Sequence, residues 1–277
     1  MSEHKLLAQY GLKYNPFLPA IPTEDLWEPG FASSFFYRVE TLVLDGGFAL
    51  LTGEPGLGKS KILQLLSHRL DALGDVVVGV MERPQSTVTD FYRELGDLFG
   101  VNLAPNNRYG GFKLLRQRWK DHIKSKLFRP ILLIDEAQEM ETGCLNELRL
   151  LGSVNFDSES LLTTVLSGDS RLPDRFRTRA LLPLGSRIRV RLAIEPWSRE
   201  DLRAYLDHAI RQAGASQLMT DELKDAVVDH AAGNPRILTA LGAELLDAAA
   251  AQSRPNLDDK LFLELYSRQP RPRSVVQ

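Results

Sequence analysis

The stretch Gly53-Glu54-Pro55-Gly56-Leu57-Gly58-Lys59-Ser60 decides the fold, because it matches the pattern GxxxxGK[ST] of a phosphate-binding loop. An apolar run at 48–51 precedes the loop and an amphipathic segment at 62–73 follows it, which is the strand–loop–helix context that the motif needs. Glycines let the backbone wind tightly, so that successive N–H groups point at phosphate oxygens. We expect Lys59 to reach the β- and γ-phosphates and the Ser60 hydroxyl to ligate Mg²⁺. The candidate nucleotide-binding residues of this segment are Gly53, Glu54, Pro55, Gly56, Leu57, Gly58, Lys59, Ser60 and Lys61.

A second motif, Ile131-Leu132-Leu133-Ile134-Asp135-Glu136, supplies the usual acidic partner of such a loop. Four consecutive aliphatic residues predict a buried parallel strand, which delivers two carboxylates at its C-terminal end. We expect Asp135 to hold Mg²⁺ through water, and Glu136 to orient and deprotonate the attacking water. The two motifs together predict an enzyme that binds a nucleoside triphosphate with magnesium and hydrolyses it.

Bulk composition is that of an ordinary globular protein. The chain has 277 residues, of which 43% are hydrophobic and 25% charged, enough for one large domain or a domain with a small companion. The single Cys144 excludes an internal disulfide framework and fits a reducing cytosol. Neither a secretion signal nor an apolar stretch of 18 residues occurs, so we expect a cytoplasmic protein with no membrane partner. The net charge of −2 argues against a protein whose whole surface coats nucleic acid.

Hydrophobic periodicity predicts an α/β part followed by a helical part. Five short apolar runs predict strands at 48–52, 76–81, 131–135, 162–167 and 187–193. Helical periodicity fills the gaps at 60–73, 88–99, 112–127 and 142–151. Because strands alternate with helices, we predict an α/β fold with a five-stranded parallel sheet covered on both faces.

After Pro196 no strand pattern occurs. Ser198 and Thr220 are predicted to cap helices, Pro235 to begin a third helix, and 258–266 to form a short fourth. We therefore divide the chain into an N-terminal segment (1–47), an α/β nucleotide-binding domain (48–195), an all-helical lid (196–267) and a flexible Pro/Arg-rich tail (268–277).

A phosphate-loop domain followed by a small helical domain resembles the AAA+ ATPases, which implies ATP as the nucleotide. By this resemblance Arg236, in Gly233-Asn234-Pro235-Arg236, would contact the γ-phosphate and couple the lid to the nucleotide state. The alternative is a solvated arginine at an ordinary helix start. Ser167, at the end of the fourth predicted strand, would position the lytic water.

The AAA+ resemblance also implies an arginine that acts on the ATP of a neighbouring subunit, and hence an oligomer. Arg187 in Gly185-Ser186-Arg187 is our choice for this role, with Arg175, Arg177 and Arg179 as rivals. The same arginines also fit a solvated face or a strip that faces DNA.

Several phrases together are similar to a narrower family, the ExeA/GspA-like AAA+ ATPases of general secretion and of bacterial transposition. They are Tyr10-Gly11-Leu12, Asn15-Pro16-Phe17, Asp135-Glu136-Ala137-Gln138, Ser186-Arg187-Ile188 and Gly233-Asn234-Pro235-Arg236. The resemblance covers roughly residues 8–266, and it implies that the N-terminal segment lies near the adenine, with Phe17 offering its ring. The alternative for Phe17 is an anchor that packs on the core. Ser60 replaces the commoner Thr, and Ser167-Gly168-Asp169 departs from the usual Gly-Gln.

Local charge suggests contacts with nucleic acid. Seven basic residues and one acid lie between Lys113 and Arg129, and the residues Lys113, Arg116, Lys120 and Lys124 form a stripe at helical spacing. The loop at 106–111 is predicted to be flexible, basic and aromatic. Arg108, Lys113 and Arg83 are our candidates for contacts with the phosphates of duplex DNA, which would be sensitive to salt and blind to sequence. The alternative for the stripe is a solvated helix face.

The favoured hypothesis is an ATPase that assembles on duplex DNA as a ring or filament when ATP is bound, recruits or licenses a transposase, and disassembles on hydrolysis. The absence of a membrane span and of a peptidoglycan-binding domain before Gln277 favours the transposition branch, with the tail from Gln269 as a docking segment. A secretion or cell-envelope helper ATPase, a DNA-binding scaffold with little turnover, and a helicase loader are the alternatives. Glu136 argues against the scaffold, which needs no residue to activate water.

Overall fold

The structure is a computed structural model that describes residues 3–82, 84, 87–102, 107–126, 128–156 and 158–266. The chain forms two compact units. One is Glu28–Glu195, which we call the α/β unit, and the other combines Met1–Trp27 with Pro196–Gln277, which we call the helical unit. Residues 1–47, which we treated as one N-terminal segment, are divided between the two units after Trp27.

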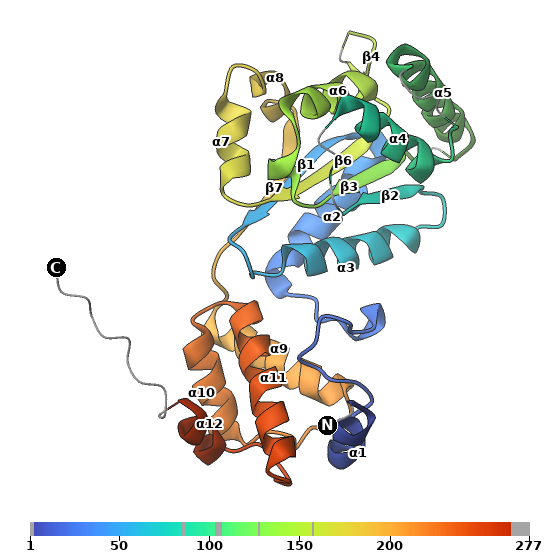
Figure 1. Ribbon diagram of the computed structural model, residues 1–277. Coiled ribbons are helices and arrows are strands. Elements are labelled where there is room, and N and C mark those ends of the chain that lie inside the picture. The colour runs from blue at the N-terminus through green and yellow to red at the C-terminus, as the bar shows by residue number, and fades with distance from the viewer. Residues whose placement is uncertain are drawn as a thin grey trace, which may run out of the picture. The chain divides into compact units, whose positions relative to one another are not determined.

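The α/β unit is built on a five-stranded parallel sheet, as the sequence predicts (Figure 1). The strands are β1 Gly47–Gly53, β2 Val78–Met81, β3 Ile131–Ile134, β6 Thr163–Gly168 and β7 Ile188–Ile194. Their order across the sheet is β2-β3-β6-β1-β7, so β6 lies between β1 and β3. The phosphate loop follows β1 and the acidic pair follows β3. The order therefore brings both motifs, with the end of β6 between them, to one edge of the sheet.

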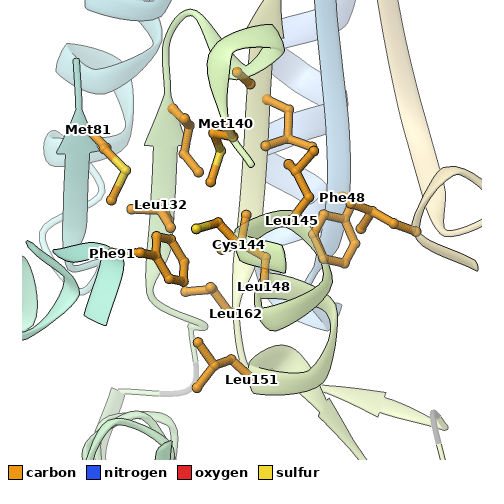
Figure 2. Close-up of a cluster of buried hydrophobic side chains, with 14 of the residues drawn as sticks. Phe48, Met81, Phe91, Leu132, Met140, Cys144, Leu145, Leu148, Leu151 and Leu162 are labelled. Atoms are coloured by element: carbon orange, nitrogen blue, oxygen red, sulfur yellow. The ribbon is translucent and has the colours of Figure 1, made fainter. Parts of the chain in front are cut away.

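Helices cover both faces of this sheet (Figure 1). On one face lie α2 Gly30–Asp45 and α3 Lys59–Asp71, and on the other lie α4 Val88–Phe99 and α6 Thr142–Gly152, with α5 Arg108–Lys126 packed against them. Apolar side chains from three strands, Phe48, Met81 and Leu132, meet Phe91 of α4 and Leu145 of α6 in a buried cluster (Figure 2). This packing fixes the ends of the strands that carry the motifs.

Several elements of the α/β unit are not predicted by the sequence. They are the helix α2, the short helices α7 Arg171–Arg177 and α8 Leu182–Gly185, the 3-10 turn η2 Ala137–Glu139, and the two-stranded hairpin of β4 Ser153–Val154 and β5 Glu159–Ser160. The two short helices and the hairpin strands contain too few residues for a period to be readable. The helix α2 does bury Phe35, Phe36 and Val39 at helical spacing, and its start is marked by Pro29.

Helix α5 begins at Arg108 rather than at residue 112, so the part of the predicted flexible loop from Arg108 to Gly111 is the first helical turn. The side-chain oxygen of Asn107 accepts a hydrogen bond from the Gly110 N–H at 2.8 Å. This contact satisfies one of the N–H groups that a helix start leaves without a partner, which explains the earlier start.

The helical unit consists of the N-terminal α1 Glu3–Tyr10, the turn η1 Thr23–Asp25, and α9 Arg199–Gln212, α10 Asp221–Ala231, α11 Pro235–Ala251 and α12 Asp259–Tyr266. The caps are those that the sequence predicts. Ser198 Oγ accepts from the Asp201 N–H at 3.0 Å and Thr220 Oγ1 accepts from the Leu223 N–H at 3.3 Å. In the described ranges, no helix combines the length and the apolar character that crossing a membrane requires.

Candidate nucleotide-binding and hydrolysis site

The phosphate-loop residues form a tight turn between β1 and α3. Gly56 and Gly58 have φ angles of 91° and 94°, in the left-handed region that glycine adopts without steric cost. Gly58 is the N-cap of α3, so the N–H groups of the first helical turn lie at the loop. These donors, together with the positive end of the helix dipole, make the turn suitable for a phosphate.

Lys59 begins α3, and its side chain folds back over the loop. Its Nζ donates to the carbonyl oxygens of Gly53 at 2.9 Å and Glu54 at 3.3 Å. Only 7% of the residue is exposed, so the ammonium group is held inside the turn. Phosphate oxygens can take the place of these two carbonyl acceptors.

Three donors fix the Asp135 carboxylate at the end of β3. Ser60 Oγ donates to Oδ2 at 2.6 Å, Ser167 Oγ donates to Oδ1 at 2.9 Å, and the Glu136 N–H donates to Oδ1 at 3.0 Å. Ser167, expected to contact the lytic water, is fully buried at the end of β6. Its hydroxyl orients Asp135 instead, because burial leaves it only partners within the protein.

The donor set suits a magnesium ion. The Ser60 hydroxyl and the Asp135 carboxylate present oxygen ligands side by side, 2.6 Å apart, and a hard cation prefers such ligands. No group of three or more His, Cys, Asp or Glu side chains that could hold a metal occurs in the part of the chain that the structure describes. Magnesium needs no such cage, because waters and phosphate oxygens complete its coordination in nucleotide sites.

Glu136 directly follows Asp135 and has an uncommon backbone conformation. Its φ is 50°, in the left-handed region that non-glycine residues rarely adopt, and its side chain is exposed at the edge of the sheet. The Glu136 carboxylate accepts a hydrogen bond from the side-chain amide of Gln138. Gln138 ends the family phrase Asp135-Glu136-Ala137-Gln138, and the sequence alone predicts no role for it.

The match to a known family covers this site. The protein-family model described as an AAA domain matches residues 43–176 of this chain. These residues contain the phosphate loop and the strand that is followed by Asp135 and Glu136. The chain has the AAA P-loop NTPase fold. This fold implies nucleotide binding, and it agrees with the fold class that the sequence predicts.

One sequence relative and two solved structures describe the similarity. General secretion pathway protein A of Aeromonas hydrophila is 32% identical over 211 residues, which are 75% of this chain and 38% of that protein. The chain thus spans well under half the length of this relative. The ADP form of the Aeropyrum pernix ORC2 protein gives a TM-score of 0.73 at 15% identity, over 91% of this chain and 72% of that one. The Aeropyrum pernix ORC1 protein in complex with DNA gives a TM-score of 0.66 at 17% identity, over 91% of this chain and 68% of that one. At these identities the two structures share the AAA fold with this chain.

Arg175, one of the candidates for a trans-acting arginine in this AAA fold, is bound within its own subunit. Its guanidinium donates to the carbonyl oxygens of Gln138 at 2.6 Å and Met140 at 2.7 Å. These two bonds hold η2, the turn that follows the acidic pair. Arg175 therefore has a structural role that explains its position.

The remaining arginine candidates lie on or near the surface of the α/β unit. Arg177 pairs with Asp174 at 2.9 Å at an exposed position, and Arg179 is exposed. Arg187 is half-buried directly before β7, and its guanidinium donates to the carbonyl oxygen of Pro183. Its place directly before the edge strand β7 keeps Arg187 as our candidate.

Arg236 lies in the first turn of α11, in the helical unit. The Asn234 side chain caps this helix, accepting from the Arg236 N–H at 3.0 Å and the Ile237 N–H at 3.4 Å. The Arg236 side chain is exposed. The predicted sensing arginine is therefore presented on a well-capped helix start.

Phe17 is an anchor of the N-terminal segment, the alternative that the sequence left open. It belongs to the core of the helical unit and is 5% exposed. Its ring lies so close to Gly242 of α11 that a Cβ there would be 2.5 Å from the ring atom Cδ1. Because the ring is buried in this core, its position is that of a packing anchor rather than of a free aromatic face.

Arg108, predicted to contact DNA, forms an ion pair with Glu147 of α6. Glu147 is buried and also accepts a hydrogen bond from the Tyr92 hydroxyl at 2.7 Å. Burial, followed by this bond to Glu147, raises the pKa of Tyr92, and the Glu147 contact raises the pKa of Arg108. A buried carboxylate needs a cation, and Arg108 supplies it to Glu147 while its own side chain stays 63% exposed.

The other basic candidates have different surroundings. Lys113 is exposed, with its Nζ 4.6 Å from the centre of the Tyr109 ring. Arg116 instead donates to three carbonyl oxygens at the end of α6, those of Leu150, Leu151 and Ser153, at 3.0, 3.0 and 2.6 Å. The predicted basic stripe is thus interrupted by a helix-capping arginine. Arg83 lies outside the described residues.

Proposed function

We propose that this chain is a magnesium-dependent ATPase. The observation that carries the proposal is the Ser60–Asp135–Ser167 arrangement, which links the phosphate loop, the acidic strand and the strand between them. Lys59 and the loop N–H groups would bind the phosphates, and Glu136 would take a proton from the attacking water. Mg²⁺, held by Ser60 and Asp135, would neutralise charge on the phosphates during transfer.

The proposed enzyme works as an oligomer, in which the nucleotide site of one subunit is completed by the next. Arg187 would stabilise the transition-state charge on a neighbour's ATP, and Arg236 would report the γ-phosphate to the helical unit. Both roles rest on the AAA+ resemblance. The positions of Arg187 before the edge strand β7 and of Arg236 at a helix start support them.

Duplex DNA is the partner that we favour for the ATP-bound assembly. The exposed lysines of α5, Lys113, Lys120 and Lys124, could meet backbone phosphates, and the ORC1 protein of similar fold was solved in complex with DNA. Recruitment of a transposase and the cytoplasmic location are the finer parts of this proposal. Recruitment of a transposase rests on the family resemblance alone, since none of the relatives named above is a transposition protein. The cytoplasmic location rests on the sequence features described above.

Fluorescence anisotropy of a labelled duplex, with a non-hydrolysable ATP analogue or with ADP, tests the DNA part. We expect cooperative, salt-sensitive binding with the analogue only. Lys113→Ala should weaken binding and reduce the slope of log affinity against log salt by about 1, whereas Lys260→Ala, an exposed lysine of α12, should not. If the protein binds the duplex neither with the ATP analogue nor with ADP, DNA is removed from the proposal.

A second function, a helper ATPase in secretion, is favoured by the Aeromonas hydrophila relative, at 32% identity over 75% of this chain. In that function the ATPase chemistry would be the same, but the partner would be an envelope protein. Co-purification with envelope proteins, together with no affinity for DNA in either nucleotide state, would establish it over the first.

A further inference from the structure

The Gln138 side chain connects Glu136 to the end of the neighbouring strand β6. Its Nε2 donates to Glu136 Oε2, and its Oε1 accepts from the Asp169 N–H at 3.2 Å. A carboxylate only accepts hydrogen bonds and a backbone N–H only donates. The two partners therefore determine which end of the amide is nitrogen, and a flipped amide would lose both bonds.

The surroundings of Gln138 leave the amide little freedom. The residue is 8% exposed, and its backbone carbonyl is held by Arg175 at 2.6 Å. Gly168 provides the space for the amide, because a Cβ at that position would lie 2.6 Å from Gln138 Oε1 and 2.8 Å from Leu172 Cδ2. The amide is thus clamped between η2 and the end of β6.

Glu136, by contrast, has little else to hold its carboxylate. Its side chain is exposed, and among the described residues Gln138 supplies its only side-chain hydrogen bond. The left-handed backbone of Glu136 aims the side chain but does not fix its outer torsions. An unrestrained glutamate would sample many positions relative to a water, so a fixed donor at its carboxylate has a catalytic consequence.

We propose that Gln138 is a positioning residue for hydrolysis, which holds the Glu136 carboxylate at the sheet edge beside the end of β6. This inference rests on the proposed ATPase function. Gln138 acts through Glu136, and its side-chain hydrogen bonds within the described residues go to Glu136 and Asp169, not to Lys59, Ser60 or Asp135. Its loss should therefore slow the chemical step and leave nucleotide binding intact.

Two substitutions separate positioning from packing. Gln138→Ala removes both hydrogen bonds and most of the side-chain volume, whereas Gln138→Met removes both hydrogen bonds and keeps the volume. We expect kcat to fall about tenfold or more in both variants, since misplacement of a reacting group by an ångström can cost about 100-fold. KM and affinity for an ATP analogue should stay close to wild type in Gln138→Met. The exposed Gln217→Ala is the matched control.

Single-turnover hydrolysis by Glu136→Gln and by Glu136→Gln/Gln138→Ala completes the test. If Gln138 acts through Glu136, adding Gln138→Ala to the Glu136→Gln protein changes the rate by less than about twofold. An active wild type with unchanged kcat in Gln138→Met, or an equal slowing with and without Glu136, would overturn the inference while leaving the ATPase proposal standing. No difference between wild type and Glu136→Gln would overturn the ATPase proposal itself.

Discussion

Replacing Phe17 by Ala should destabilise the helical unit and leave nucleotide affinity unchanged. The ring is 5% exposed within a core that includes Leu206 and Leu245. Truncating a buried phenylalanine costs about 3–5 kcal/mol, from the lost transfer of the ring and the cavity that remains. At about 1.4 kcal/mol for each factor of ten, the folding equilibrium constant of the unit should fall by roughly two to three and a half orders of magnitude.

A second substitution turns this into a quantitative cycle. In Gly242→Ala the added Cβ would lie 2.5–2.6 Å from ring atoms Cδ1 and Cε1 of Phe17, so the ring or the helix must shift. Overpacking of this kind costs about 1–3 kcal/mol. In Phe17→Ala/Gly242→Ala the methyl group has the vacated space, and the double variant should be more stable than the sum of the single losses predicts.

Urea unfolding followed by circular dichroism gives the stabilities, and titration with a fluorescent ATP analogue under native conditions gives the affinities. Lys59→Ala serves as the control that loses affinity without losing a buried contact of the helical unit. A Phe17→Ala protein of wild-type stability and reduced affinity for the analogue would refute the anchor and restore the adenine contact.

Three further predictions follow from side chains of the α/β unit. Arg116→Met removes the donor to three carbonyls at the end of α6 and should lower the free energy of unfolding, measured in urea, by about 1.5–3 kcal/mol. Lys120→Met is the matched change at an exposed position and should alter that free energy by no more than about 0.5 kcal/mol. Burial raises the pKa of the Cys144 thiol to about 11, so it should react with a thiol reagent at pH 8 only after urea is added; rapid reaction of the native protein would contradict its place in the core. Arg187→Ala should hydrolyse ATP poorly alone but recover when mixed with Lys59→Ala, which contributes an intact arginine; no recovery at any ratio counts against action in trans.

The sequence predicts the sheet and the nucleotide motifs because the signal for each lies in a short, continuous stretch of residues. Apolar runs of strand length locate β1, β3 and β6 to within a residue or two, and Ser198 and Thr220 mark helix starts by their own side chains. The spacing of the phosphate loop predicts its backbone, since glycine is needed where φ is positive.

What the sequence could not predict depends on contacts between segments that are distant along the chain. Arg108 is a surface cation, as the sequence suggests, but its pairing with the buried carboxylate of Glu147, 39 residues away, is not readable from the sequence. Phe17 could have been a free aromatic face, and only the glycine at position 242 shows that a helix packs on it. The bridge made by Gln138 required the register of β6, which no local pattern contains.

Release of phosphate from ATP by wild type, Glu136→Gln and Lys59→Ala, with Mg²⁺ or with EDTA and with or without duplex DNA, tests the central claim most directly. We expect turnover by the wild type only with Mg²⁺. Glu136→Gln should bind the ATP analogue without turnover, and Lys59→Ala should bind little. Equal phosphate release by wild type and Glu136→Gln under every condition would show that the site binds a nucleotide without hydrolysing it.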